Sequence, residues 1–291
     1  MMPTVFGIPS YGIAIAGGTL VVMGLARRLA RREGIDPEVV IDVTLICAIV
    51  GLLGTRAAHV LEFWEHYRQL GWTEVLRLDR GGLSWYGSLL VLPAAWLYFR
   101  RRGLPVLRML DLFALYLPAA QLFGRLGCFA AGCCWGERVS EGASGLLAWS
   151  AVRFPVGSPA WLAHAGAALG TGPLGAEQAQ AAFAALPPAL QQGSWPVVPV
   201  QLLLSAAGLV VSVVCLFCHG RLRRHGQLFA LVFTLLAAAR FGLEALRGDN
   251  PMLGPLSLHQ YYSLAAALGG ALGYAALGRW GPPRQAPVPA R

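Results

Sequence analysis

The chain has 291 residues, of which 56% are hydrophobic and only 13% are charged, a composition outside the range of soluble globular domains. The formal net charge is +9 and all 23 basic residues are Arg, but no basic cluster is interleaved with aromatic residues in a polar surface. We therefore expect a membrane protein and no nucleic-acid partner.

Seven apolar stretches predict transmembrane helices, because a helix needs about 20 mostly apolar residues to cross the hydrocarbon core. In chain order they are Ile8–Ala26, Val39–Phe63, Leu83–Phe99, Leu107–Phe129, Val200–Phe217, Leu228–Leu246 and Leu258–Leu277. The first is expected to be retained and not cleaved, because no basic residue precedes it and Arg residues follow it.

The arginines between these stretches predict the orientation of the chain. Clusters at residues 27–32, 100–108, 221–224 and 279–291 all fall on one side of a seven-span arrangement. The positive-inside rule then places the N-terminus outside and the C-terminus in the cytoplasm. The expected fold is an all-α membrane protein with seven transmembrane helices.

Residues 1–279 are expected to form a single transmembrane domain. Residues 133–199, between spans four and five, are rich in Gly, Pro and Ala and predict a small extracytoplasmic head, with a helix over residues 175–186. Residues 280–291 are expected to be a disordered cytoplasmic tail.

Three arginines lie inside the predicted spans: Arg56, Arg125 and Arg240. An ionisable group at that depth normally faces the bundle interior with a partner and marks a site. Arg240 and Glu244 are four residues apart, and Arg56 and His59 three, so each pair shares a helix face. A structural ion pair is the simpler alternative for either pair.

All three arginines fall in the half of the bilayer nearer the outside, and few carboxylates are near enough in sequence to neutralise them. The surplus positive charge predicts an anion-binding site. A guanidinium suits bidentate phosphate binding, and the phosphate at that depth belongs to an outer-leaflet phospholipid. The glycines around Arg125 would let neighbouring helices and the lipid approach closely.

The six cysteines leave several alternatives open. Cys215–His219, "CLFCH", matches the pattern of c-type haem attachment, but it adjoins the predicted cytoplasmic Arg cluster, so an electron carrier is not expected. Cys128, Cys133 and Cys134 lie at the outer face, where a disulfide from Cys128, free packed thiols or a covalent catalytic role are the alternatives. We expect no metal, because a fourth ligand is not evident, and no cofactor.

The stretch "GRLGCFAAGCCWG" resembles the signature of the prolipoprotein diacylglyceryl transferases. Other pieces follow in that family's order: "SYG" at 10–12, "GLLGTR" at 51–56, "GGLSWYGSLL" at 81–90, "PVQLL" at 199–203, "RFGLEALRGD" at 240–249 and "LSLHQYYSL" at 256–264. Each piece alone is weak, but the ordered set covers most of the chain.

This resemblance implies a seven-helix enzyme of the bacterial cytoplasmic (inner) membrane. Such enzymes move a diacylglyceryl group from phosphatidylglycerol to the lipobox cysteine of a preprolipoprotein, so both molecules are the implied partners. Arg125 and Arg240 match the family's essential arginines, and Tyr86 joins them as a catalytic candidate. The implied substrate-binding residues are Tyr11, Arg56, Gly87, Cys128, Gly136, Gln201, Glu244, Arg247 and Gln260.

Three positions depart from the family's pattern: Tyr86 stands where His is usual, Cys128 where Asn is usual, and Leu204 where Glu is usual. A His accepts a thiol proton at neutral pH, whereas Tyr is a poor resting base, so Tyr86 is expected to donate a hydrogen bond to the phosphate or the ester. The alternative function is a related protein that binds phospholipid, or transfers a diacylglyceryl group, without lipobox activity.

Overall fold

The computed structural model describes residues 4–5, 8–76, 84–140, 142–247 and 252–284. Their secondary structure is almost entirely helical, with two short antiparallel hairpins, β1 (Thr4–Val5) with β2 (Ile8–Pro9) and β3 (Met252–Leu253) with β4 (Leu256–Ser257). The chain divides into two compact units. Among the described residues, unit 1 contains those up to 22 and from 113 to 284, and unit 2 contains residues 23–112. The expected single transmembrane domain stays a prediction.

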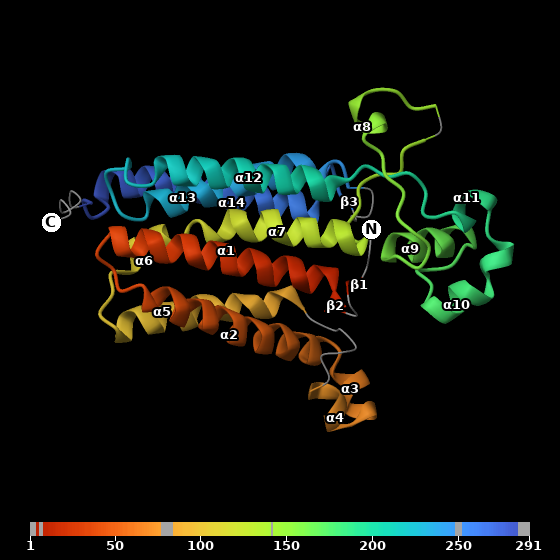
Figure 1. Ribbon diagram of the computed structural model, residues 1–291, viewed down its shortest axis with the longest axis horizontal. Coiled ribbons are helices and arrows are strands. Elements are labelled where there is room, and N and C mark those ends of the chain that lie inside the picture. The colour runs from red at the N-terminus through yellow and green to blue at the C-terminus, as the bar shows by residue number, and fades with distance from the viewer. Residues whose placement is uncertain (1–3, 6–7, 77–83, 141, 248–251, 285–291) are drawn as a thin grey trace. The chain divides into compact units, whose positions relative to one another are not determined.

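Unit 1 is a bundle of long helices (Figure 1). The first half of α1 (Ser10–Arg32) packs with α7 (Tyr116–Ala131), α7 with α12 (Val200–Cys218), α12 with α13 (Gln227–Glu244), and α13 with α14 (Leu258–Trp280).

Small residues allow these helices to approach closely. A Cβ built on Gly208 of α12 would lie 2.7 Å from the Pro118 oxygen of α7, so the two backbones are in contact there. On α14, a Cβ on Gly270 would lie 2.4 Å from the Thr234 hydroxyl oxygen of α13. Close approach of this kind is the usual packing of helices in a membrane, where apolar burial supplies little attraction between them.

The predicted head contains short helices after α7: α8 (Leu146–Trp149), α9 (Pro159–Ala168), α10 (Ala176–Ala181), η2 (Phe183–Ala185) and α11 (Pro188–Gln191). Ser158 caps α9 by accepting a hydrogen bond from the Trp161 backbone N–H, and Pro159 occupies the first helical position. Trp161 is buried against Leu186 and Leu190, which gives the head a small core of its own. The helix expected over residues 175–186 is confirmed as α10 followed by η2.

Unit 2 contains the second half of α1, α2 (Glu38–Glu62), α3 (Trp64–Leu70), α4 (Trp72–Leu76), η1 (Trp85–Leu90), α5 (Val91–Arg101) and most of α6 (Val106–Phe113). Helix α2 packs on η1 and α5. A Cβ on Gly54 would lie 2.3 Å from the Gly87 oxygen, and one on Gly87 would lie 1.9 Å from the Gly54 oxygen. Both positions therefore require glycine.

Five helical segments in the described part of the chain are long and apolar enough to cross a membrane: Tyr11–Arg32, Glu38–Glu62, Val106–Ala131, Val200–Cys218 and Gln227–Glu244. The protein is thus an all-α membrane protein. These segments match predicted spans one, two, four, five and six. Spans three and seven, and with them the orientation, stay predictions.

Prolines explain two breaks that simple hydropathy does not show. Predicted span four is divided at Ala114–Leu115, and a proline at 118 lacks an N–H and clashes with the carbonyl of residue 114 four positions earlier. Predicted span three begins as the 3₁₀ helix η1 and becomes α-helical at Val91, just before Pro93. The start of span three, at Leu83, lies outside the described residues.

The last described residues, 281–284, run beside the connection between α12 and α13. The Arg284 N–H donates to the Arg223 oxygen at 2.9 Å, and the Arg224 guanidinium donates to the Gly281 oxygen at 2.8 Å. Residues 285–291, where most of the expected tail falls, lie outside the described residues.

Candidate active site at the ends of α7 and α13

The signature stretch ends α7 in a tight C-terminal cap. Gly132 has φ +74°, its N–H donates to the Phe129 oxygen at 3.2 Å, and the Cys133 N–H donates to the Cys128 oxygen at 3.1 Å. These two bonds make a Schellman motif, which needs a residue in the left-handed region and therefore favours glycine. The motif folds Cys133 back over the last turn of α7, toward Cys128.

Three thiols gather at this cap. The Sγ atoms of Cys128, Cys133 and Cys134 all lie within 4.8 Å of one another, and each side chain is partly buried. All six cysteines of the chain are free thiols in the structure, so none of the disulfides considered from the sequence is present. The sequence placed these cysteines at one face, and the Schellman motif is the reason that they meet.

Hydrogen bonds among the three thiols shift the pKa values of Cys133 and Cys134 in opposite directions. Bonds with Cys128 and Cys133 lower the pKa of Cys134, and the Arg125 and Arg247 guanidiniums act in the same direction against the effect of burial. Bonds with Cys128 and Cys134 raise the pKa of Cys133. Cys134 is therefore the more acidic thiol of the two.

Helix α1 closes over the same turn of α7. A Cβ on Gly127 would lie 3.0 Å from the Tyr11 ring, so a larger residue there would require Tyr11 or α1 to shift. Tyr11 lies within electrostatic reach of Arg125 and of the three thiols. The Tyr11 ring thus lies against Gly127 in the signature, and substrate binding by Tyr11 stays a prediction.

Arg125 is partly buried and has no hydrogen-bond or ion-pair partner among the residues that the structure describes. Arg125 is also within electrostatic reach of Arg240 on α13. Arg247, just beyond that helix, is within electrostatic reach of Arg240 too. Arg125 and Arg240 thus influence each other electrostatically, and a binding site that they share stays a prediction. An unpaired guanidinium in an apolar bundle favours an anion as its missing partner.

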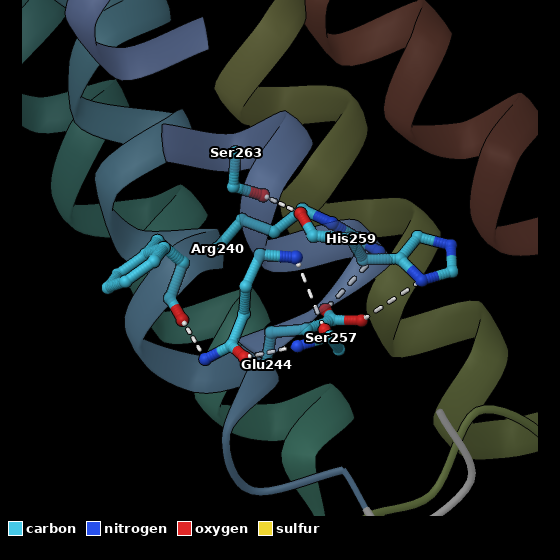
Figure 2. A network of polar contacts seen from close by, with 7 residues as sticks. Arg240, Glu244, Ser257, His259 and Ser263 are labelled. Atoms are coloured by element: carbon cyan, nitrogen blue, oxygen red, sulfur yellow. Dashed lines mark hydrogen bonds and ion pairs between the residues drawn. The ribbon is translucent and has the colours of Figure 1, made fainter. Parts of the chain in front are cut away.

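Arg240 has one carboxylate beside it (Figure 2). Its Nη2 lies 3.3 Å from Oε2 of Glu244, whose side chain is only 1% exposed, as the four-residue spacing predicted. The other carboxylate oxygen, Oε1, lies 3.8 Å from Nδ1 of His259 on α14. Glu244 thus holds Arg240 on one side and faces His259 on the other.

His259 was not anticipated from the sequence as part of the site. A local sequence feature could have identified His259: it comes two residues after Ser257, the N-cap of α14. A residue in the first turn of α14 faces the end of α13 once the β3–β4 hairpin has reversed the chain.

Three other predicted substrate-binding residues have structural roles. Gln260 forms a capping box with Ser257, accepting from its N–H at 2.9 Å, while the Ser257 hydroxyl accepts from the Gln260 N–H at 3.2 Å. A Cβ on Gly136 would lie 2.8 Å or less from the Val198 and Leu246 oxygens, so this position requires glycine. Gln201 is fully buried and donates to the Cys133 oxygen at 2.7 Å.

The remaining predicted site residues belong to unit 2. Arg56 donates through Nε to the Val75 oxygen at 2.8 Å and through Nη2 to the Glu74 oxygen at 2.5 Å, and its guanidinium lies over the Tyr67 ring. Gly87 makes the close contact of η1 with α2. Tyr86 lies in η1, but its side chain is outside the described residues. A common site for these residues with Arg125 stays a prediction.

Comparisons with known proteins assign the chain to a family. The model of the prolipoprotein diacylglyceryl transferase family matches residues 2–276, nearly the whole chain. The chain belongs to this family. It is therefore a transferase of lipoprotein biosynthesis, in agreement with its membrane-type helices.

Individual relatives are similar over most of their length. The phosphatidylglycerol–prolipoprotein diacylglyceryl transferase of Clostridioides difficile is 27% identical over 95% of this chain and 94% of its own. The enzyme of the same name from Gloeobacter violaceus is 27% identical over 97% and 93%, and that of Bacillus cereus strain G9842 is 27% identical over 89% and 84%.

Proposed function

We propose that this protein transfers the diacylglyceryl group of phosphatidylglycerol to the lipobox cysteine of preprolipoproteins and releases glycerol 1-phosphate. The observation that carries the proposal is Arg125, which has no hydrogen-bond or ion-pair partner among the described residues and lies within electrostatic reach of Arg240. A lipid phosphodiester supplies an anion for Arg125, since Glu244 already neutralises Arg240, and the family's relatives are named for the same lipid and protein substrates.

In this reaction the substrate's cysteine sulfur attacks the glyceryl carbon that is bonded to the phosphate ester oxygen. The new bond is a carbon–sulfur thioether, and the carbon–oxygen bond to the phosphate breaks. The electron pair of the broken bond goes to the phosphate oxygen, so negative charge grows on the leaving glycerol phosphate. Arg125 and Arg240 stabilise that charge where it develops, which lowers the barrier.

The neighbours of the two arginines have supporting roles. Glu244 fixes the rotamer of Arg240 through the ion pair at 3.3 Å. Tyr11, beside Arg125, and Arg247, beyond α13, complete the polar lining on the substrate side. Tyr86 donates a hydrogen bond to the phosphate or the ester, in the position where the family's pattern has His.

The reaction also requires an orientation. We place the ends of α7 and α13 that carry the arginines toward the outside of the cytoplasmic membrane, with seven spans, an external N-terminus and a cytoplasmic C-terminus. The positive-inside distribution of the loop arginines supports this arrangement. The head then lies on the side from which preprolipoproteins present their signal peptides.

Complementation tests the proposal. In a bacterial strain depleted of its own transferase, expression of this chain is expected to raise the mass of a reporter preprolipoprotein by one diacylglyceryl group. A reporter whose lipobox cysteine is replaced by Ser is the matched control and is expected to stay unmodified. Tight binding of phosphatidylglycerol by the purified protein with no mass gain in the reporter would favour the alternative, a related lipid-binding protein without lipobox activity.

A further inference from the structure

The three thiols at the end of α7 have the composition and spacing of a metal site. Cys128, Cys133 and Cys134 each offer one sulfur, and the three sulfurs lie within 4.8 Å of one another. In a tetrahedral zinc thiolate with Zn–S bonds of about 2.3 Å, the sulfurs are about 3.8 Å apart. The thiols therefore need to close by at most about 1 Å to share one ion.

The backbone around the thiols is built to hold them together. The Schellman motif at Gly132 fixes Cys133 against the carbonyl of Cys128, and the buried Gln201 amide holds the Cys133 carbonyl at 2.7 Å. Cys134 has φ +59°, the left-handed region that residues other than glycine seldom adopt. Such strain, of order 1 kcal/mol, persists where the surrounding structure requires it and is common at functional sites.

We propose that Cys128, Cys133 and Cys134 form a three-thiolate site for Zn²⁺ whose fourth coordination position is open. Soft thiolate ligands select zinc or copper(I) among the biological metals, and three protein ligands with one open position is the arrangement of catalytic zinc. No His, Asp or Glu of the described chain joins the three sulfurs as a fourth ligand. The missing fourth ligand, which argued against a metal at the sequence level, is thus the open position.

Charge also favours an ion here. Zinc and three thiolates carry a net charge of −1, and any thiol that is still protonated releases its proton to water on binding. Arg125 and Arg247 are both within electrostatic reach of Cys134 and compensate that charge. In an apolar bundle this compensation matters more than it would in water.

The open position has a use in the proposed transfer, on which this part of the inference rests. The lipobox thiol displaces a water from zinc and gives its proton to solvent, and the bound sulfur is then a thiolate beside the phosphate held by Arg125. When that sulfur bonds to the glyceryl carbon, the carbon–oxygen bond to the phosphate breaks, glycerol 1-phosphate leaves with the electron pair, and the uncharged thioether leaves the metal. Zinc therefore supplies the thiol activation that a His would supply at position 86.

Metal content tests the site without reference to activity. Protein purified under reducing conditions, without a histidine tag, is expected to carry about one zinc ion per chain, bound through three sulfurs at about 2.3 Å in X-ray absorption at the zinc edge. Cys134→Ser and Cys133→Ser are expected to lose the ion. Cys218→Ser, at the far end of α12 and equally partly buried, is the matched control and is expected to keep it.

Wild-type protein that binds no zinc when reduced, or zinc that survives both substitutions together, would overturn the site. The absorption spectrum at the zinc edge needs no substitution, so it decides the matter even where a variant fails to fold. Coordination by nitrogen and oxygen alone would also overturn it.

Cobalt substitution tests the open position. A lipobox peptide is expected to change the sulfur-to-cobalt charge-transfer absorption of the Co²⁺ protein, and the same peptide with Ser for Cys is expected to leave it unchanged. Equal spectra with both peptides would overturn the thiol role. Transfer that continues in zinc-free protein would do the same and leave the proposed function standing, whereas a zinc-loaded protein that never transfers lipid would refute the proposed function and leave the metal site standing.

Discussion

Arg56 and Arg125 are both arginines of membrane-type helices, yet their surroundings differ completely. In unit 2, the Arg56 guanidinium donates to two carbonyls at the C-terminal end of α4 and lies over Tyr67. In unit 1, Arg125 has no hydrogen-bond or ion-pair partner within the described residues. Arg56 satisfies helix-end carbonyls that lack partners within α4, whereas Arg125 remains available for an anion.

The depth of a charge in the membrane therefore predicts that it has a special role, but it does not predict which role. Sequence spacing grouped Arg56 with the other two arginines. The structure gives it a different task, holding the α3–α4 segment to α2. A site shared by all three arginines stays a prediction, and Arg125 and Arg240 are its candidates within unit 1.

The largest expected effect comes from removing the available charge. Arg125→Ala is expected to slow diacylglyceryl transfer about 10²–10³-fold, the usual loss when one preorganised donor to a developing anion is removed. Its melting temperature should stay close to that of wild type, because no described side chain loses a partner. Mass spectrometry of the reporter lipoprotein measures transfer. Arg101→Ala, exposed at the end of α5, is the control and should remain fully active.

Arg56→Ala is expected to act on stability. Loss of two charged hydrogen bonds to α4 and of the contact with Tyr67 should lower the free energy of unfolding by about 2–3 kcal/mol. Transfer should fall only with the folded fraction. Thermal unfolding in detergent measures the change. Unchanged stability together with abolished transfer would erase the contrast between the two arginines and return Arg56 to the anion site.

The head contains a buried titratable side chain, His164. His164 is 9% exposed, and its Nδ1 accepts from the Trp195 N–H at 3.2 Å. Burial and the nearby Arg138 lower the pKa of His164 from 6.5 to about 4. Between these values the unfolded chain binds more protons than the folded one, so stability rises with pH across this window and is lost as pH falls.

We expect the head to lose roughly 2 kcal/mol of stability between pH 7 and pH 5 through this group. Tryptophan fluorescence during unfolding at several pH values measures the slope. His164→Gln keeps a hydrogen-bond acceptor without titrating, so it should flatten the slope between pH 4 and 6.5. A slope that persists in this variant would show that another group causes it.

The smallest effect is expected at Tyr86. Tyr86→Phe should slow transfer about tenfold, since a single hydrogen bond to a charged group contributes about 1.5 kcal/mol. Tyr86→His should change the rate at neutral pH little if zinc activates the thiol. A large gain in Tyr86→His would instead identify proton removal as the limiting step and would weaken the zinc account.

Much of the fold follows from the sequence, because apolar length and arginine position are strong signals in a membrane protein. Five predicted spans coincide with long apolar helices. The breaks at Ala114 and before Val91 were readable in principle, since Pro118 and Pro93 lie three or four residues after them. The Gly- and Ala-rich α14 is long enough to span but is less apolar, so its place in the membrane remains a prediction.

The site was harder to predict, because contacts across the chain decide it. The Arg240–Glu244 pair follows from helix spacing alone. The hydrogen bonds of Arg56 to α4 depend on how a loop returns to α2, and those of Gln260 depend on where α14 begins. The meeting of three thiols requires the Schellman cap at Gly132, which the letters "AAGCC" suggest only once a helix is known to end there.

Binding of phosphatidylglycerol shows whether Arg125 holds the lipid phosphate. The purified wild-type protein in phosphatidylcholine nanodiscs is titrated with labelled phosphatidylglycerol, beside Arg125→Ala of equal melting temperature. We predict saturable binding by the wild type and at least about tenfold weaker binding by the variant, the cost of about 1.4 kcal/mol for one lost charged contact. Equal affinity in the two proteins would contradict the assignment of Arg125 to the lipid phosphate.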